Sequence, residues 1–185
     1  ELAGLMGAPV ITTLLVVAAA PPDFDVVPTL TTLSRLEVTQ TSLSEQDLET
    51  IAQGPNIRTL VIDECGLDDL APLAGAPSLV TFSGPRNELE SIAPIAAWSD
   101  VETVVFEENP LKSLEGIEAL EELAELDVSQ TEIADLAPLL ANQWFRLRDQ
   151  VDLRETDIDE GDCPAILDLI EREAIVRLDD GVECE

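Results

Sequence analysis

The sequence contains no histidine and no tyrosine, and Lys112 is its only lysine. Without histidine, no imidazole base can activate a serine or cysteine nucleophile, and no histidine can ligate zinc. Glycine-rich phosphate-binding loops and metal-ligand motifs are also missing. These absences remove most catalytic classes, so we expect a protein that is not an enzyme and that uses no cofactor.

Positive charge is scarce too. Nine Lys and Arg residues stand against 39 Asp and Glu residues, which gives a formal net charge of −30. Such a field repels phosphate backbones and anionic lipids, so nucleic acid and membrane surfaces are not expected partners. The most apolar run, Val10 to Ala20, is too short to span a bilayer and lacks the preceding positive charge of a signal peptide.

Apolar residues are plentiful, at 45% of the 185 residues, which favours a folded protein over an acidic disordered tail. They recur with a period of 22 residues, mostly at positions 1, 4, 11, 14, 17 and 20 of a unit, and often at position 6. From the second unit on, position 9 holds Asn, Thr or Cys. Only the step from the second unit to the third is longer, by two residues. The units begin at Ile11, Leu33, Ile57, Leu79, Val101 and Leu123.

The pattern L-x-x-L-x-L-x-x-N-x-L, with an Ala-Pro pair recurring near Pro72, Pro94 and Pro138, resembles the leucine-rich repeat superfamily. The most similar type is the bacterial class with 22-residue repeats that includes the internalins. This resemblance implies an α/β solenoid shaped like a horseshoe. A parallel β-sheet lines its concave face, and mostly 3₁₀ and extended segments form its convex side. Stacked repeats bury one continuous core, with residues 4 and 6 of each strand pointing inward.

The two ends depart from this regularity. Leu2, Leu5 and Ala8 fit positions 14, 17 and 20 of a preceding unit, so the chain opens within a repeat. No comparable cap is seen there, so either the chain was cut from a longer protein or something else covers that edge. Beyond the sixth unit, a stretched unit of about 25 residues follows. Its positions 4, 6, 9 and 11 are Val151, Leu153, Thr156 and Ile158.

The last residues predict a cap. We expect the solenoid at 1–160 and a terminal cap at 161–185, made of an amphipathic helix at Ala165–Glu173 and a last strand at Ile175–Leu178. In bacterial leucine-rich repeat proteins, cysteines placed like Cys163 and Cys184 close such a cap with a disulfide, and two free thiols are the alternative. Cys65 falls on position 9, where the family holds a buried structural residue. A disulfide implies a secreted, periplasmic or cell-surface location.

The resemblance also implies a function, which is protein recognition through the outward residues of the concave strands. Position 3 carries threonines, position 5 alternates apolar and polar residues, and two acidic pairs flank Arg86. Ser129 is expected to face outward with them. The alternative is a solvated strand face without a partner. The candidate partner-binding residues are Thr59, Val61, Asp63, Glu64, Thr81, Ser83, Arg86, Thr103, Val105, Glu107, Glu108 and Asp127.

Two other interpretations stay open. The protein could have a structural role in a surface layer or a longer repeat chain, with its acidity reflecting adaptation to salt. An ordinary acidic extracellular protein explains the charge equally well. Calcium is a weaker hypothesis: Asp157 to Asp162 begins like a calcium loop, but Gly161 stands one place early and Asp168 replaces the required glutamate.

Overall fold

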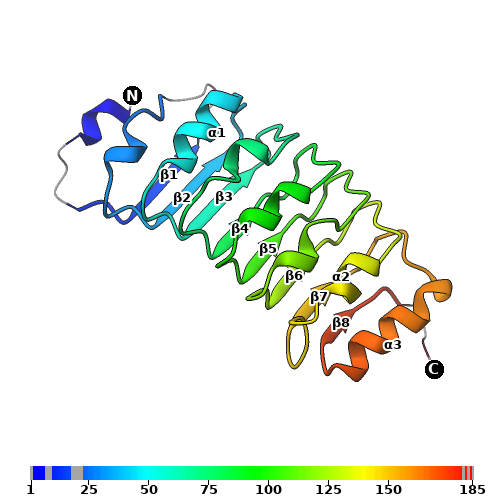
Figure 1. The fold of residues 1–185 in the computed structure, drawn as a ribbon. Coiled ribbons are helices and arrows are strands. Elements are labelled where there is room, and N and C mark those ends of the chain that lie inside the picture. Colours follow the sequence, from blue (N-terminus) through cyan, green and yellow to red (C-terminus); the bar gives the residue numbers. More distant parts are fainter. Residues whose placement is uncertain (1, 7–9, 18–22, 181, 183, 185) are drawn as a thin grey trace.

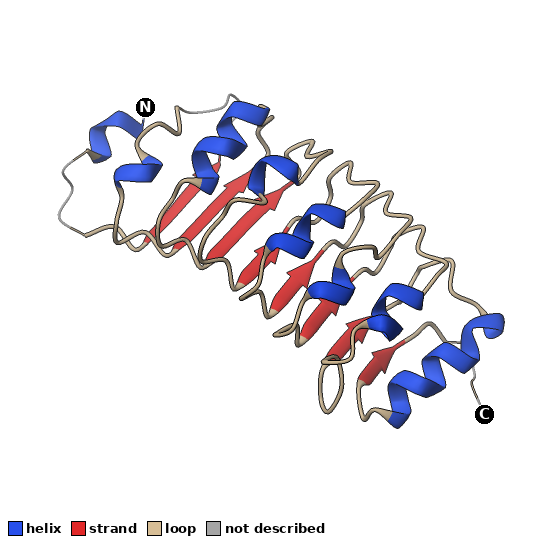
Figure 2. Cartoon of the chain, viewed as in Figure 1, coloured by secondary structure: helices blue, strands red, loops and turns tan. Residues whose placement is uncertain are grey.

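The computed structural model describes residues 2–6, 10–17, 23–180, 182 and 184. It is an elongated stack of repeats, with one β-sheet along one side and short helices along the other (Figure 1; Figure 2). The strands follow one another in chain order across the sheet. They are β1 (Thr13–Val17), β2 (Arg35–Thr39), β3 (Thr59–Asp63), β4 (Thr81–Ser83), β5 (Thr103–Val105), β6 (Glu125–Asp127), β7 (Gln150–Asp152) and β8 (Ile175–Arg177).

Every neighbouring pair of these strands is parallel, and the register equals the repeat position. Phe82, for example, pairs with Leu60 on one side and with Val104 on the other, and all three occupy position 4. The stretched unit keeps this register, because Val151 pairs with Leu126. The leucine-rich repeat solenoid is therefore confirmed, including the alignment of its irregular unit.

Most predicted core positions are buried, whereas Ile11, Leu14 and Leu43 in the first two units are partly buried against the core. Aromatic residues fill its middle, where the ring of Phe82 lies 5.0 Å from that of Trp98 and 5.6 Å from that of Phe106. The indole N–H of Trp98 donates to the Leu73 carbonyl of the preceding unit at 3.0 Å, which satisfies its buried polar atom. The few large side chains thus join adjacent repeats.

Short helical turns form the convex side, as expected for 22-residue units. In several of them a proline stands at the first or second helical position, where its fixed φ favours the turn and its missing N–H costs nothing. The turns are η1 (Leu2–Leu5), η2 (Val27–Thr29), η3 (Ala71–Leu73), η4 (Ala93–Ala97), η5 (Ile117–Ala119) and the five-residue helix α2 (Ala137–Ala141).

Helix α1 (Glu45–Ala52) differs from this pattern, since it is an α-helix of eight residues. It lies in a unit that is two residues longer than the regular 22-residue units, so the chain has room for two helical turns. Ser44 caps its N-terminus in a capping box with Asp47, and Leu48 and Ile51 are buried against the core. Length and capping together explain why this segment is not a 3₁₀ turn.

The C-terminal segment consists of η6 (Glu160–Asp162), α3 (Cys163–Glu171) and β8. Helix α3 begins and ends two residues earlier than predicted. Its buried residues Ile166 and Leu169 cover the end of the core. Cys163 and Cys184 form a disulfide with an S–S distance of 2.04 Å, which confirms the expected pairing. The bond joins the start of α3 to the chain beyond β8.

At the other end, Leu2 and Leu5 are partly buried against the core, and Ala8 lies outside the described residues. Strand β1 exposes Leu15 and Val17, at 58% and 62% of their surface. None of the helices in the described part of the chain combines the length and apolar character needed to cross a membrane.

Candidate functional site

The outward side of the sheet carries the candidate residues, and its middle is a floor without charge. Thr59, Thr81 and Thr103 pair in register across β3, β4 and β5. Val61, Ser83 and Val105 form a second row beside them, with the same pairing. All six are half-buried. Because parallel strands are spaced about 4.8 Å apart, each row presents equivalent side chains at a fixed interval.

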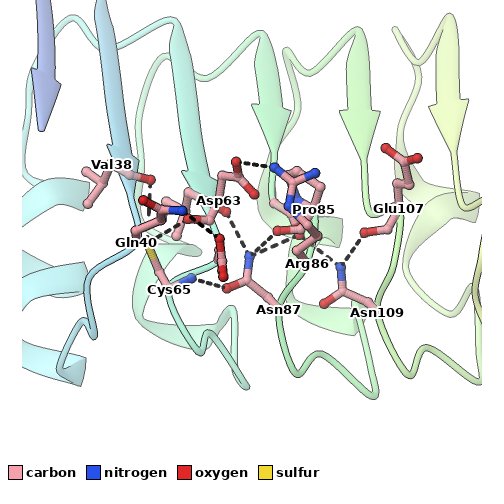
Figure 3. A network of polar contacts seen from close by, with 12 residues as sticks. Val38, Gln40, Asp63, Cys65, Pro85, Arg86, Asn87, Glu107 and Asn109 are labelled. Atoms are coloured by element: carbon pink, nitrogen blue, oxygen red, sulfur yellow. Dashed lines mark hydrogen bonds and ion pairs between the residues drawn. The ribbon is translucent and has the colours of Figure 1, made fainter. Parts of the chain in front are cut away.

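A polar rim borders this floor where the strands end. The guanidinium of Arg86 binds the Asp63 carboxylate of the neighbouring repeat, and Gln40 donates to Glu64 at 3.0 Å (Figure 3). The carboxylate of Asp63 is only 19% exposed, so Arg86 neutralises a partly buried charge. The pKa of the Arg86 guanidinium is raised by this hydrogen bond and ion pair.

From the second unit to the stretched unit, position 8 adopts a left-handed conformation, and the sequence did not reveal this feature. The φ angles lie between 53° and 57°, although no glycine stands there. In five consecutive units, the backbone N–H of the position-8 residue donates to the carbonyl at position 7 of the following unit. This bond fixes the turn that ends each strand. The position-8 residues are Gln40, Glu64, Arg86, Glu108, Gln130 and Glu155.

Beneath the rim, position-9 side chains hold the turns from inside (Figure 3). The Asn87 Oδ1 accepts from the backbone N–H groups of Cys65 and Leu67, each at 3.0 Å. Its Nδ2 donates to the Ile62 carbonyl at 2.8 Å, among others. Asn109 repeats this arrangement one unit later. The amide thus pairs backbone groups that the turn would otherwise leave buried without partners.

Cys65 occupies the same column and is 3% exposed. Its Sγ lies 3.2 Å from the Asp63 carbonyl, and burial raises the pKa of the thiol. A protonated, buried thiol is a poor nucleophile. This agrees with the predicted structural role, and the candidate site contains no reactive cysteine among the described residues.

Several acidic residues lie just beyond the end of β5 and on β6. Burial raises the pKa of the Glu107 carboxyl, and the nearby carboxylates of Asp127 and Glu108 raise it further. Arg86 has the opposite effect but is bound to Asp63. Asp127 accepts hydrogen bonds from the backbone and hydroxyl of Ser129, which is consequently buried at 5% exposure. Ser129 therefore presents little surface to a partner, although its hydroxyl lies against the outward carboxylate of Asp127.

A second ionic cluster on β7 and β8 was missed in the sequence. Arg154 binds Asp152 at 2.7 Å, and Arg177 lies 3.6 Å from the same carboxylate. Burial raises the pKa of Asp152, but the hydrogen bonds and charges of Arg154 and Arg177 outweigh it and hold the pKa below its usual value. The sequence could have revealed this cluster. With Val151 and Leu153 at positions 4 and 6, Asp152 and Arg154 fall on the outward positions 5 and 7.

The structure thus brings all twelve candidate residues onto one side of the sheet. Thr59, Val61, Thr81, Ser83, Thr103 and Val105 form the floor, and Asp63, Glu64, Arg86, Glu107, Glu108 and Asp127 its charged border. Ala18, an outward position of the first unit, lies outside the described residues. In the described part of the chain, no group of three or more acidic or cysteine side chains is arranged to hold a metal ion. At Asp157–Asp162, Asp159 instead accepts from the Gly161 backbone in a helical turn.

No family model matches this chain, and no curated protein matches its sequence. Solved structures do resemble it. An internalin, InlF of Listeria monocytogenes, aligns with 85% of this chain at 18% identity and a TM-score of 0.64. Internalin C2 from the same species aligns with 85% at 22% identity and a TM-score of 0.66. The functional domain of its InlJ, described as including a cysteine ladder, aligns with 90% at 14% identity and a TM-score of 0.55.

The chain has the internalin-type leucine-rich repeat fold. It corresponds to 53%, 66% and 44% of the lengths of these three proteins, so it spans less than two thirds of each. In this internalin-type solenoid, the sheet supplies the floor and the strand-ending turns supply the charged rim.

Proposed function

We propose that this chain is a non-catalytic protein-recognition module that binds its partner on the concave strand face. The observation that carries the proposal is the half-exposed neutral floor of β3 to β5, fixed in register and bordered by oriented charges. Rigid side chains lose little conformational freedom on binding, and threonine and valine have few rotamers to lose. The internalin-type fold supports a protein-interaction module in general.

We propose further that the protein is secreted or surface-attached in a bacterium. The Cys163–Cys184 disulfide supports this location, because such bonds persist in oxidising compartments and are rare in the cytosol. The strongly negative surface and the absence of clustered metal ligands in the described residues leave a protein as the expected partner.

The test is a crosslinking pull-down from envelope and culture fractions of the source organism. The wild type is compared with a Val61→Asp, Arg86→Glu, Val105→Asp variant, which changes the floor and its border. A matched control with Ala96→Asp, Lys112→Glu and Ala119→Asp makes the same change in net charge on exposed convex residues. Circular dichroism first establishes that all three fold.

A partner captured by the wild type and the control, but lost from the concave variant, supports the proposal. Equal capture by all three contradicts it and moves the binding site off the concave face. If both the concave variant and the convex control fail to capture the partner, binding depends on net charge alone. This result also contradicts the proposal.

A second candidate function is end-to-end assembly of solenoids. The observation in its favour is the apolar outward surface of β1, where Leu15 and Val17 are more than half exposed. Light scattering across a concentration series distinguishes it, because assembly raises the mass with concentration. A Leu15→Glu, Val17→Glu variant is expected to abolish that rise, and a constant monomer mass of the wild type contradicts assembly.

A further inference from the structure

The loop between α2 and β7, residues 142–149, is the longest departure from the regular repeat, and it projects from the stack in Figure 1. Its base is held rigidly. The Asn142 Nδ2 donates to the Ile117 and Leu120 carbonyls at 2.8 and 2.9 Å, and its Oδ1 accepts from the backbone of Phe145. The Phe145 ring is fully buried. The loop is therefore built on the core of the solenoid.

The tip of this loop consists of Arg146, Leu147 and Arg148. The Arg146 N–H donates to the Asp149 carboxylate at 2.7 Å, and the Arg148 N–H donates to the Glu173 carbonyl at 2.9 Å. Arg148 has a φ of 68°, a conformation that is costly for a residue with a side chain. These contacts hold the tip in one strained conformation, although 58% of the Leu147 surface faces solvent.

The two arginines of the tip lack ion pairs within the described part of the chain. Six of the nine cationic side chains do pair with a carboxylate: Arg35, Arg86, Lys112, Arg154, Arg172 and Arg177. Arg58 is the third cationic side chain without an ion pair among the described residues, but it has no second unpaired arginine close to it in the sequence. Two neighbouring unpaired guanidiniums that flank an exposed leucine therefore point to a carboxylate supplied from outside.

A hollow beside the tip offers a place for it, lined by Leu140, Gln143, Arg146 and Arg172. Arg172 is held there, because it donates to the Leu140 and Asn142 carbonyls at 3.0 and 3.1 Å and pairs with Asp168. A second hollow that Arg146 also lines includes Glu121, Glu122 and Asp149, which repel an anion. An acidic ligand therefore meets less repulsion in the hollow beside Leu140, where Arg146 is the cation without an ion pair.

We propose that the 146–148 tip is a second protein-binding site that takes an acidic segment of a partner. One carboxylate binds Arg146 from the Leu140 side, a second binds Arg148, and an apolar side chain between them covers Leu147. Arginine forms paired hydrogen bonds with carboxylates and is enriched among residues that dominate interface energies. The net charge of −30 repels extended polyanions, so a short acidic protein segment fits better than nucleic acid.

The test is a selection of random peptides displayed on phage against the folded wild type at about 0.15 M salt, where long-range repulsion is screened. Enriched peptides are synthesised, and their affinities are measured by fluorescence anisotropy. Peptides with paired Asp or Glu residues beside an apolar residue are expected. An Arg146→Gln, Arg148→Gln variant is expected to bind them about tenfold more weakly, the loss typical of a hydrogen-bonded charge pair.

The matched control is Arg58→Gln with Lys112→Gln, which removes two positive charges elsewhere and is expected to bind the peptides like the wild type. The concave variant Val61→Asp, Arg86→Glu, Val105→Asp is also expected to bind them, which separates this site from the proposed concave face. Enrichment of basic or neutral peptides, no enrichment, or equal affinity of the Arg146→Gln, Arg148→Gln variant each overturns the proposal.

Discussion

At the scale of single residues, the position-9 column and the position-8 turn explain how each strand ends. Asn87 satisfies backbone groups of its own turn and of the preceding unit, with its side-chain nitrogen and oxygen both used. The preference for Asn at position 9 was visible in the sequence. The left-handed conformation at position 8 was not, because residues such as Glu108 and Arg86 give no glycine signal for it.

Replacing Asn87 by alanine is expected to destabilise the protein by about 3 kcal/mol, because the backbone N–H groups of Cys65 and Leu67 become buried without partners. Urea unfolding at a fixed salt concentration measures the change. Glu88→Ala, which alters the exposed neighbour, serves as the control and is expected to change stability little. A loss below about 1 kcal/mol would show that water replaces the amide.

The Glu107 carboxyl is expected to make the stability of the protein depend on pH. Its pKa is raised in the folded protein, so the carboxylate opposes folding at neutral pH, and this penalty disappears as pH falls through the folded pKa, above the usual value of 4.5. Glu107→Gln is expected to be more stable than the wild type at pH 7. The difference should vanish near pH 4, as measured by thermal melting. A pH-independent difference would contradict the electrostatic explanation.

At the scale of elements, helix type follows from the length of each unit and from its capping residues. The 24-residue unit contains α1, whereas the 22-residue units hold 3₁₀ turns, most of which have a proline at their start. The C-terminal cap has to cover the exposed end of the core. Helix α3 and strand β8 do this, and the Cys163–Cys184 disulfide links the start of α3 to the chain beyond β8. Its helix was predictable from apolar spacing, but its boundaries were set by Pro164 near the start of the helix and by Arg172, which follows it.

Removing the disulfide by Cys163→Ser with Cys184→Ser is expected to destabilise the protein by about 3 kcal/mol, because the bond closes a loop of 21 residues. Hydrogen exchange should show faster opening of α3 and β8 than of β3 to β5. A reducing agent should lower the melting temperature of the wild type but leave that of the double variant unchanged. Equal sensitivity of both would attribute the effect to another group.

At the scale of the whole molecule, charge and shape have separate origins. The core is a continuous apolar column, while the acidic residues lie mostly on the surface of every repeat. With 39 acidic and nine basic residues, ion pairs can neutralise only a small part of the negative charge. The surplus charge opposes the compact state through self-repulsion.

Salt is therefore expected to stabilise the protein. The free energy of unfolding, measured by urea titration at increasing NaCl, should rise as repulsion is screened. A plateau at a few tenths molar agrees with an ordinary acidic protein, because the Debye length is then already only several ångströms. A rise that continues into the molar range agrees with salt adaptation. No rise at all would contradict a destabilising role of the net charge.

The repeat, the strand register, the buried positions and the position-9 residues were predictable from the amino-acid sequence, because they depend on a periodic pattern of side-chain polarity. The sequence also placed the candidate floor on one strand face. Which charges meet follows from the folded arrangement of the repeats. Arg86 binds Asp63 across 23 residues and Arg177 reaches Asp152, whereas the guanidiniums of Arg146 and Arg148 form no ion pair within the described residues. Such pairings depend on the stagger of stacked turns and on rotamers, which periodicity does not encode.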